Sequence, residues 1–490
     1  DLRNSIYRKV MSFSSREYHK FSTASLITRS TNDVQQVQQV MAMMFRIVLY
    51  APILGIGGVL KVLNTDSSMT WILGVAVGLI LIVIFVLFQV AMPKFTILQT
   101  LIDRLNLVSR EILTGIPVIR AFSREKHEED RFEKANLDLT KTNLFVNRCM
   151  TFMMPIMMLI MNGVSVLIIY SGAHAVDNGT MQVGNVMAFI QYAMQIIMSF
   201  LMITAMSIML PRANVAALRI DEVLKTEVSI QDPETPVHPS ESVKGEIEFD
   251  HVSFAYPEAG ENVLTDISFK AKKGQTIAVI GSTGSGKSTL INLIPRYYDV
   301  TKGSVKVDGV DVRDMTQKEL RDKLGYVPQK GVLFSGTIDS NIRYGKPEIT
   351  DAQVKEAAEV AQATEFIDTK PEKYESPVSQ GGTNVSGGQK QRLSIARAIA
   401  KDPEIFIFDD SFSALDFKTD SQLRKALKEY TKDATTVIVA QRISTILGAD
   451  QIIVLDDGHM AGIGTHKELM ANCEVYQQIA RSQLSEEELA

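Results

Sequence analysis

The sequence predicts a multidomain chain in which an α-helical transmembrane domain precedes an α/β domain of the P-loop type. Long apolar runs are confined to residues 40–211 of the 490-residue chain, whereas residues 244–490 have the mixed, charged composition of a globular domain. A glycine-rich loop at residues 281–289 follows an apolar strand in this second half. We therefore expect a transmembrane domain at residues 1–228, a proline-containing linker at residues 229–243, and the P-loop domain at residues 244–490.

Four stretches are long and apolar enough to cross a bilayer, which takes about 20 residues. They run from Val40 to Leu63, Trp71 to Met92, Thr151 to Val176 and Val183 to Leu210. Buried core helices are the alternative interpretation, but four such runs so close together exceed what a soluble core needs. The transmembrane domain would therefore contact membrane lipid.

The distribution of Lys and Arg predicts which ends of these spans face the cytosol. The short connections 64–70 and 177–182 contain neither residue type, whereas the connection 93–150 and the segment before the first span are rich in both. The positive-inside rule places the basic segments in the cytosol. The chain is then a multi-pass protein of the cell membrane, with the P-loop domain in the cytosol.

The long cytosolic connection has apolar residues at helical spacing, among them Ile97, Leu101, Leu105 and Val108. We expect the second and third spans to continue as long helices well past the membrane. A helix-turn-helix tip at residues 116–136 would join them. A solvated charged loop is the alternative for this tip.

Composition limits the chemistry further. The two cysteines are far apart and offer no disulfide framework or zinc pattern, and the formal net charge of −5 gives no indication of nucleic-acid binding. Nineteen of the 22 methionines precede residue 211. Flexible, polarisable methionine suits a surface that accepts many apolar shapes. Lipid-facing or core packing explains the same residues equally well, so both interpretations stay open.

The glycine-rich loop matches the P-loop pattern GxxxxGK[ST], between the strand Thr276–Ile280 and a helix expected from Leu290. Its glycines let backbone N–H groups turn toward a phosphate, Lys287 supplies a charge to the terminal phosphates, and the Ser288 hydroxyl can bind Mg²⁺. The candidate ATP-binding residues of the loop are Gly281, Ser282, Thr283, Gly284, Ser285, Gly286, Lys287, Ser288 and Thr289.

A second motif lies farther along the chain. Four apolar residues at 405–408 end in Asp409, which predicts a buried parallel strand with a carboxylate at its C-terminal edge. This is the Walker-B arrangement, in which the aspartate holds Mg²⁺. Alone the run is a weak signal, but beside a P-loop it indicates a site for ATP and Mg²⁺.

Additional motifs resemble those of the ATP-binding cassette (ABC) family. The family's signature is matched by Ser386, Gly387, Gly388 and Gln389, preceded by Val385 where Leu is usual. Tyr256 resembles the aromatic residue that stacks on adenine, Gln329 the Q-loop glutamine that contacts Mg²⁺, and Asp416 the D-loop aspartate. All lie in the family's order and at its spacing. The resemblance implies a transporter ATPase that binds ATP and Mg²⁺, the metal lying near Ser288, Gln329 and Asp409.

The first half is similar to the type IV ABC exporters at residues 26–33 and 115–136. In that family two short coupling helices touch the nucleotide-binding domains, and by position they would fall near Ser15–Lys20 and Phe122–Glu129. A family half-transporter has six spans, whereas we count four here. We therefore expect the other two to precede Asp1, and the chain to be truncated at its N-terminus.

The ATP site departs from the family pattern. The residue after Asp409 is normally Glu, and here it is Asp410. A general base must reach the attacking water, and Asp is shorter by one bond length, about 1.5 Å, a misplacement that can cost roughly 100-fold in rate. Gln441 stands where the switch histidine is expected, and Gln lacks the charge and proton chemistry of an imidazole. Gln380, before the signature, is a third departure, because Glu is common there.

Two altered catalytic positions, Asp410 and Gln441, resemble the degenerate subunit of heterodimeric bacterial multidrug exporters. The resemblance implies a slow site on this chain's P-loop. It also implies a competent site, which this chain's signature completes on a homologous half-transporter that carries the usual catalytic Glu. The cargo would be drugs or other amphipathic, hydrophobic small molecules, moved outward by alternating access. A homodimeric exporter of lipid or peptide and an ATP-binding regulatory subunit are the alternatives.

Overall fold

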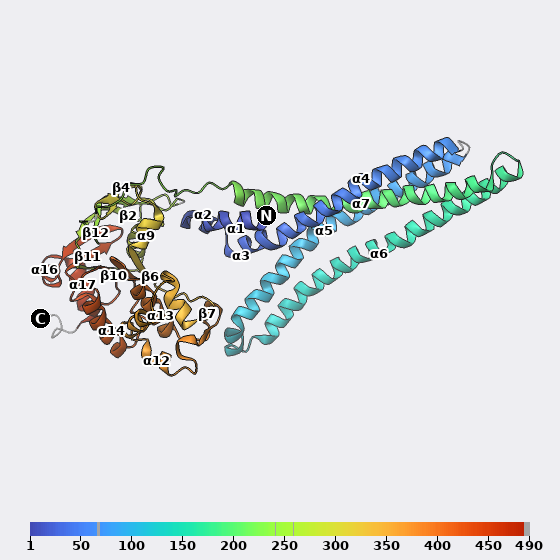
Figure 1. The fold of residues 1–490 in the computed structure, drawn as a ribbon. Helices are drawn as coiled ribbons and strands as arrows, with labels where there is room; N and C mark the ends of the chain where they lie inside the picture. The colour runs from blue at the N-terminus through green and yellow to red at the C-terminus, as the bar shows by residue number, and fades with distance from the viewer. Residues whose placement is uncertain (66–68, 241, 258, 485–490) are drawn as a thin grey trace. The chain divides into compact units, whose positions relative to one another are not determined.

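The chain divides into two compact units, coloured along the sequence in Figure 1. The computed structural model describes residues 1–65, 69–240, 242–257 and 259–484. The first unit comprises residues 1–8 and 24–225, and the second comprises residues 9–23 and 226–490.

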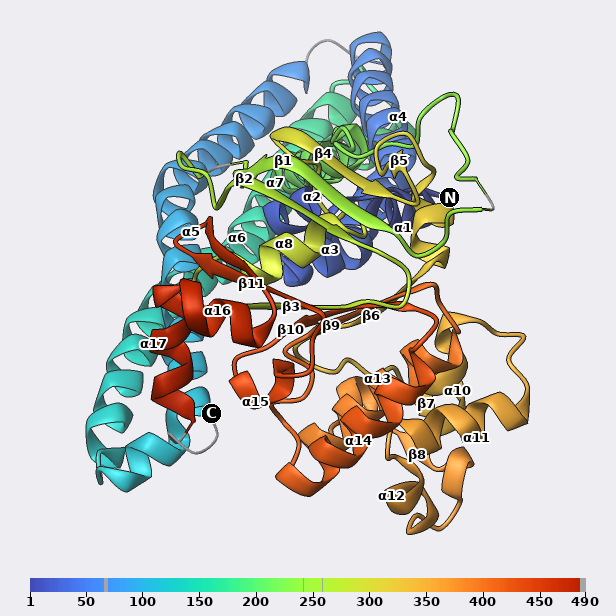
Figure 2. The same cartoon turned by 90° about the vertical axis from the view of Figure 1, so that its left-hand side faces the viewer.

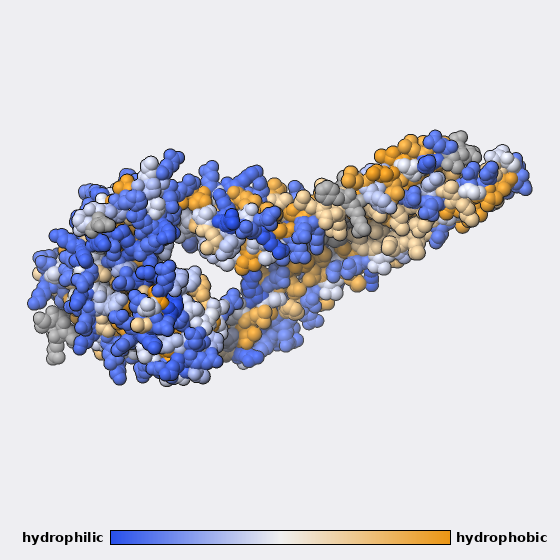
Figure 3. Space-filling model, viewed as in Figure 1, coloured by the Kyte–Doolittle hydropathy of each residue, from blue (hydrophilic) through white to orange (hydrophobic). Residues whose placement is uncertain are grey.

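The first unit is helical, with short helices followed by four long ones. They are α1 (Leu2–Met11), α3 (Thr23–Thr28), the π-helical segment η1 (Arg29–Asp33), α4 (Val34–Thr65), α5 (Thr70–Ala121), α6 (Glu125–Asp177) and α7 (Val183–Lys225). Among the described residues, the segments long and apolar enough to cross a membrane are Thr23–Asn64, Thr70–Leu87, Glu125–Asp177 and Val183–Ile203. Hydrophobic side chains gather along α4 to α7 in Figure 3, as expected for helices whose solvent is lipid.

Helices α5 and α6 are the long, continuous helices that the apolar spacing predicts, and a tight turn joins them. The turn contains Ser123 in the left-handed region, at a φ of 50°. The helix-turn-helix tip expected at residues 116–136 is confirmed, whereas the short helix expected near Phe122–Glu129 does not form as a separate element. Helix α5 continues through Pro117 to Ala121, and acidic residues in the first turn of α6 suit a helix N-terminus, so α6 begins at Glu125.

The methionine-rich stretch of α6 faces two environments. Met153, Met157 and Met161, spaced four residues apart on one helix face, pack in an apolar cluster with residues of α5 and α7. Met154 and Met158 are exposed in the single chain. Core packing therefore accounts for one face, and the other face is open to lipid, cargo or a second subunit.

The second unit is an α/β domain. Its strands are β1 (Ile247–Phe254), β2 (Leu264–Ala271), β3 (Thr276–Gly281), β4 (Lys302–Val307), β5 (Val310–Asp311), β6 (Leu324–Val327), β7 (Gly336–Thr337), β8 (Pro377–Val378), β9 (Ile405–Asp409), β10 (Thr435–Val439), β11 (Gln451–Asp456) and β12 (His459–Gly464). Over the described residues they lie in three sheets, ordered β12-β11-β3-β10-β9-β6, β2-β1-β4-β5 and β7-β8 (Figure 2).

The helices of this unit surround the sheets. They are α2 (Ser15–Lys20), α8 (Lys287–Leu293), α9 (Gln317–Asp322), α10 (Ile338–Ile342), α11 (Asp351–Val360), α12 (Thr364–Asp368), α13 (Gly387–Ala400), α14 (Phe417–Tyr430), α15 (Ile443–Ile446), α16 (His466–Asn472) and α17 (Glu474–Gln483). Short 3₁₀ turns occur at η3 (Arg343–Gly345), η4 (Lys373–Glu375) and η5 (Gln380–Gly382).

The largest sheet positions the site. Strand β10 pairs in parallel with β3 on one side and β9 on the other, and their buried apolar residues form the core with α8. The carboxyl ends of neighbouring parallel strands meet at one edge of a sheet. The residues at or just beyond these ends, Gly281, Asp409 and Gln441, are therefore brought together from distant parts of the sequence.

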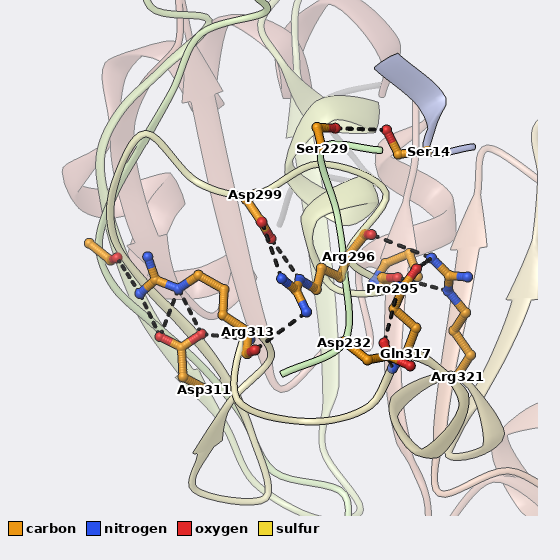
Figure 4. Close-up of polar contacts among 11 residues, drawn as sticks. Ser14, Ser229, Asp232, Pro295, Arg296, Asp299, Asp311, Arg313, Gln317 and Arg321 are labelled. Carbon is orange, nitrogen blue, oxygen red and sulfur yellow. Dashed lines mark hydrogen bonds and ion pairs between the residues drawn. The ribbon is translucent and has the colours of Figure 1, made fainter. Parts of the chain in front are cut away.

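The linker residues 229–240 belong to the second unit and are hydrogen-bonded to other parts of it. Asp232 Oδ1 accepts hydrogen bonds from the backbone N–H and the side-chain amide of Gln317, at 2.9 and 3.1 Å (Figure 4). Farther along, the backbone N–H of Val237 donates to the carbonyl of Asp314 at 2.8 Å. Several specific contacts thus tie the linker to the start of α9.

Helix α2 confirms the short helix expected at Ser15–Lys20, and it belongs to the second unit. Ser14 caps it and lies 3.1 Å from the Ser229 hydroxyl of the linker (Figure 4). The buried Glu17 accepts the Ser229 backbone N–H at 3.2 Å. Burial raises the pKa of the Glu17 carboxyl, but hydrogen bonds from Ser14 and Ser229 outweigh that effect and lower it overall.

We predict that the ion pair of Lys323 with buried Asp308 stabilises the second unit. The Lys323 ammonium lies 2.8 Å from the Asp308 carboxylate, whose side chain is fully buried. Lys323→Ala would leave that charge unpaired and should cost about 3 kcal/mol. The measurement is the thermal unfolding midpoint of the full chain. Lys318→Ala, which removes an exposed pair with Asp322, is the control and should leave the midpoint unchanged. Equal effects of the two variants would contradict the prediction.

Candidate functional site

The P-loop lines a cavity of about 530 Å³ at the carboxyl edge of the parallel sheet. Gly286 precedes α8 at a φ of 95°, and a Cβ there would lie 2.8 Å from the Leu264 side chain. Only glycine fits that position. Helix α8 begins at Lys287, three residues earlier than the Leu290 start expected from the sequence. The cavity is lined by Val263, Gly281, Ser282, Thr283, Gly284, Gly286, Lys287, Ser288, Thr289, Gln329, Gln441, Ile479, Ser482 and Gln483.

Lys287 is folded over the loop that it belongs to. Its ammonium donates to the carbonyls of Gly281 and Ser282, at 2.8 and 2.6 Å. Burial lowers the pKa of Lys287, and the charges of Asp410 and Asp409 oppose that shift. A partly desolvated cation at the cavity attracts an anion such as a phosphate more strongly than one in water does.

Asp409 and Ser288 meet at the end of β9. The Ser288 hydroxyl donates to Asp409 Oδ1 at 3.0 Å, and Asp409 is buried. Burial raises the pKa of the Asp409 carboxyl, the hydrogen bond from Ser288 opposes this, and the neighbouring Asp410 charge raises it further. The sequence placed both residues at one site, and the structure brings them into contact.

Asp410 and Gln441, the two positions that depart from the family pattern, touch each other. The Gln441 side-chain amide donates to Asp410 Oδ2 at 2.7 Å, and the Gln329 amide donates to the same oxygen at 3.3 Å. The Asp410 backbone is held as well, since its N–H donates to the Val439 carbonyl at 3.0 Å. Asp410 is thus a buried carboxylate whose Oδ2 already accepts two amide donors.

Tyr256 lies beside the P-loop in an aromatic group. Its hydroxyl is 3.0 Å from that of Thr289, and its ring meets those of Phe254 and Tyr298 edge-on. The structure therefore places an aromatic face next to the loop. Stacking of Tyr256 on adenine stays a prediction.

The signature and the D-loop aspartate occupy helix N-termini. Ser386 and Gln389 form a reciprocal capping box at the start of α13. Asp416 caps α14 by accepting the Thr419 backbone N–H at 3.0 Å, and hydrogen bonds from Thr419 lower the pKa of Asp416. In the described chain, the lining of the P-loop cavity includes neither the signature residues nor Asp416.

Helix α17 contributes residues to the cavity that the sequence analysis did not identify, among them Ile479, Ser482 and Gln483. They follow the last recognised motif by many residues and match no pattern of their own. Only the amphipathic spacing of the C-terminal helix could have pointed to a packed role, and it does not indicate a nucleotide site.

We predict that ionisation of Asp409 destabilises the nucleotide-free chain. Burial raises the pKa of Asp409 in the folded chain, so the folded chain binds this proton more tightly than the unfolded chain does. The stability that the bound proton contributes is fully present below the ordinary aspartate pKa and is lost as pH rises through the raised pKa. Asp409→Asn should therefore raise the thermal unfolding midpoint at neutral pH, and the gain should vanish toward acidic pH. Asp416→Asn is the control, since the pKa of Asp416 is lowered, and it should give no gain. A lower midpoint for Asp409→Asn at neutral pH would refute the prediction.

Comparisons with known proteins agree with both halves of the chain. A family model described as ABC transporter transmembrane region matches residues 1–200, and one described as ABC transporter matches residues 264–413. The chain is 43% identical to an uncharacterized ABC transporter ATP-binding protein of Mycobacterium tuberculosis, over 99% of this chain and 83% of the relative. It is 36% identical to YgaD of Bacillus subtilis, which is named as a multidrug export ATP-binding/permease protein, over 96% of this chain and 81% of the relative.

A solved structure is similar over nearly the whole chain. It is that of a bacterial Atm1-family ABC exporter with ATP bound, with a TM-score of 0.81 and 25% identity, covering 99% of this chain and 85% of that one. The helical first unit and the P-loop unit thus correspond to the two domains of one known architecture. The chain belongs to the ABC transporters, as a type IV exporter half-transporter with membrane-spanning helices and a cytosolic domain that binds and hydrolyses ATP.

Proposed function

We propose that this chain is the degenerate-site subunit of a heterodimeric exporter that moves drugs or other amphipathic compounds out across the cell membrane. Its own P-loop site binds ATP and hydrolyses it slowly, and its signature completes the hydrolytic site of a homologous partner that carries the usual catalytic Glu. Closure of the two ATP sites would drive alternating access of the membrane domain.

The contact between Asp410 and Gln441 is the observation that carries the proposal. A general base needs an accessible lone pair within hydrogen-bond reach of the attacking water. Asp410 has a shorter side chain than Glu, and Gln441 and Gln329 both donate to its Oδ2. The carboxylate is therefore held back toward the protein. Gln441 at this position cannot exchange a proton as an imidazole does.

The residues around Asp409 fit Mg²⁺. A buried carboxylate in contact with a hydroxyl supplies the hard oxygen ligands that this ion prefers. Within the described residues, no group of three or more His, Cys, Asp or Glu side chains could hold a metal ion. Ser288 and Asp409, with Gln329, would thus hold Mg²⁺ together with phosphate oxygens, and the ion would neutralise charge on the phosphates.

The signature supports the assignment of a role in trans. Ser386 and Gly387 are exposed at the N-terminus of α13, a helix of 14 residues, and a Cβ added at Gly387 would meet nothing within 4 Å. A phosphate could therefore approach the helix N-terminus closely. An intact signature beside a weakened base suits a chain that activates its partner's site more than its own.

The amphipathic cargo is supported by two observations. Relatives such as YgaD are named for multidrug export. Exposed methionines on α4 and α6, such as Met44, Met154 and Met158, offer a polarisable surface that adapts to different apolar shapes.

We predict that the partner's site sets the turnover of the complex. In the chain purified with its partner, replacement of the partner's catalytic Glu by Gln should abolish ATP hydrolysis, whereas Asp410→Glu here should change it little. In the partner-inactive complex, the pair Asp410→Glu and Gln441→His should raise residual turnover by about 100-fold, because it restores the reach and chemistry of the base. Gln380→Glu, a departure outside the carboxylate contact, is the matched control and should restore nothing.

Rapid ATP hydrolysis by this chain without a partner would contradict the proposal. If this chain alone forms dimers that hydrolyse ATP at rates typical of the family, Asp410 is a working base. The slow-site proposal is then wrong.

We also predict that amphipathic drugs stimulate the ATPase of the reconstituted complex and accumulate inside inverted vesicles in an ATP-dependent manner. A Lys287→Ala variant of this chain, which loses the phosphate-binding cation, is the control for uptake. Stimulation by lipids or peptides alone would favour the alternative cargo. Absence of any stimulated turnover would favour a regulatory subunit.

A further inference from the structure

Gln483, the last residue of α17, forms a two-point clamp on the backbone that follows β10. Its Oε1 accepts the N–H of Ile443 at 2.8 Å, and its Nε2 donates to the carbonyl of Gln441 at 2.9 Å. The side chain therefore binds the main chain on both sides of Arg442. We call residues 441–445 the switch segment.

Helix α17 gives the clamp a fixed base. Tyr476 and Ala480 are fully buried, in one apolar cluster with Ile443 and Ile446. The Tyr476 hydroxyl lies 2.7 Å from His466 Nδ1, so α16 supports α17 from its other end. The exposed Gln483 thus extends from an anchored helix rather than from a loose tail.

The clamp acts on the residue that contacts Asp410. Because Gln483 binds only the backbone of Gln441, the Gln441 side chain is left to donate to Asp410 at 2.7 Å. From the other side, the Arg424 guanidinium donates to the Ser444 carbonyl at 2.7 Å. Two side chains from separate helices therefore hold the switch segment, and Gln483 is the one nearest to Gln441.

Gln483 also lines the P-loop cavity together with Gln441 and Lys287. A backbone clamp at the cavity wall sets where the Gln441 amide lies relative to a nucleotide in that cavity. A positioned donor contributes more to binding than one that must be ordered each time.

We propose that Gln483 is a positioning residue of the ATP site, which holds the switch segment so that the Gln441 amide meets the terminal phosphate of ATP. This inference rests on the proposed function, in which the P-loop site of this chain binds ATP. The Gln441 amide nitrogen carries two N–H groups, so it can donate to Asp410 and to a phosphate at the same time. It adds Gln483, which lies far in sequence from every recognised motif, to the residues that distinguish ATP from ADP.

The test compares the binding of two nucleotides to the chain in lipid nanodiscs, purified without a second subunit. Affinities for ADP and for the non-hydrolysable analogue adenylyl imidodiphosphate are measured by displacement of a fluorescent nucleotide. Gln441→Ala should lower the preference for the analogue over ADP about tenfold, since one hydrogen bond to a charged group is lost. Gln483→Ala should give the same loss with ADP affinity unchanged, and the double variant should lose no more than either single one.

Two further variants make the result specific. Gln483→Glu has the size of glutamine but places a carboxylate oxygen against the Gln441 carbonyl, so it should also lose the preference, whereas a packing role would tolerate it. Gln477→Ala is the matched control. Gln477 lies on the same helix but donates to the Met470 carbonyl, so this variant should behave as wild type.

Equal loss of both nucleotides in Gln483→Ala would reduce Gln483 to a structural anchor and overturn the proposal. So would an unchanged preference, or losses that multiply in the double variant. Because no hydrolysis is needed, the outcome does not depend on whether the site is slow. The slow-site proposal is judged by turnover alone, and the two can fail separately.

Discussion

The parallel pairing of β3, β10 and β9 is the constraint on which the ATP site depends. The register places the ends of three strands at one sheet edge, so the P-loop, the Walker-B carboxylates and the switch segment meet although they are far apart in sequence. The strands are buried on both faces, as their nearly continuous apolar sequence predicts for parallel strands inside an α/β domain. Every contact of the site, from Ser288 with Asp409 to Gln441 with Asp410, follows from this edge.

The same edge concentrates charge in a buried place. Lys287, Asp409 and Asp410 lie close enough to influence one another, and burial disfavours the charged forms of Lys287 and Asp409. Buried charges of this kind destabilise the folded chain when no ligand is bound. A nucleotide and a cation would stabilise it by pairing with these charges. Two amides donate to Asp410 Oδ2, and this contact is the basis of the proposal that the site holds ATP more than it hydrolyses it. This asymmetry underlies the proposed division of labour between two subunits.

Elements from opposite ends of the chain are held in the second unit by hydrogen bonds between a side chain and the backbone. Gln483 hydrogen-bonds the backbone of the switch segment, and Asp232 of the linker accepts the backbone N–H at the start of α9. At the N-terminal end, Glu17 of α2 accepts the backbone N–H of Ser229. Contacts of this kind fix position independently of the side chain that is held.

The sequence alone determined the class of the protein, because P-loop chemistry, the carboxylate-ended strand and long apolar runs are local patterns with local physical causes. The helical spacing of apolar residues also predicted the continuous α5 and α6, and the resemblance to type IV exporters placed α2. The tertiary structure alone decided that alternate methionines of α6 are packed or exposed, that Asp410 contacts Gln441, and that α17 lines the cavity. Such contacts join residues distant in sequence. Strand register and helix packing determine these contacts, and local sequence patterns do not show which distant residues will meet.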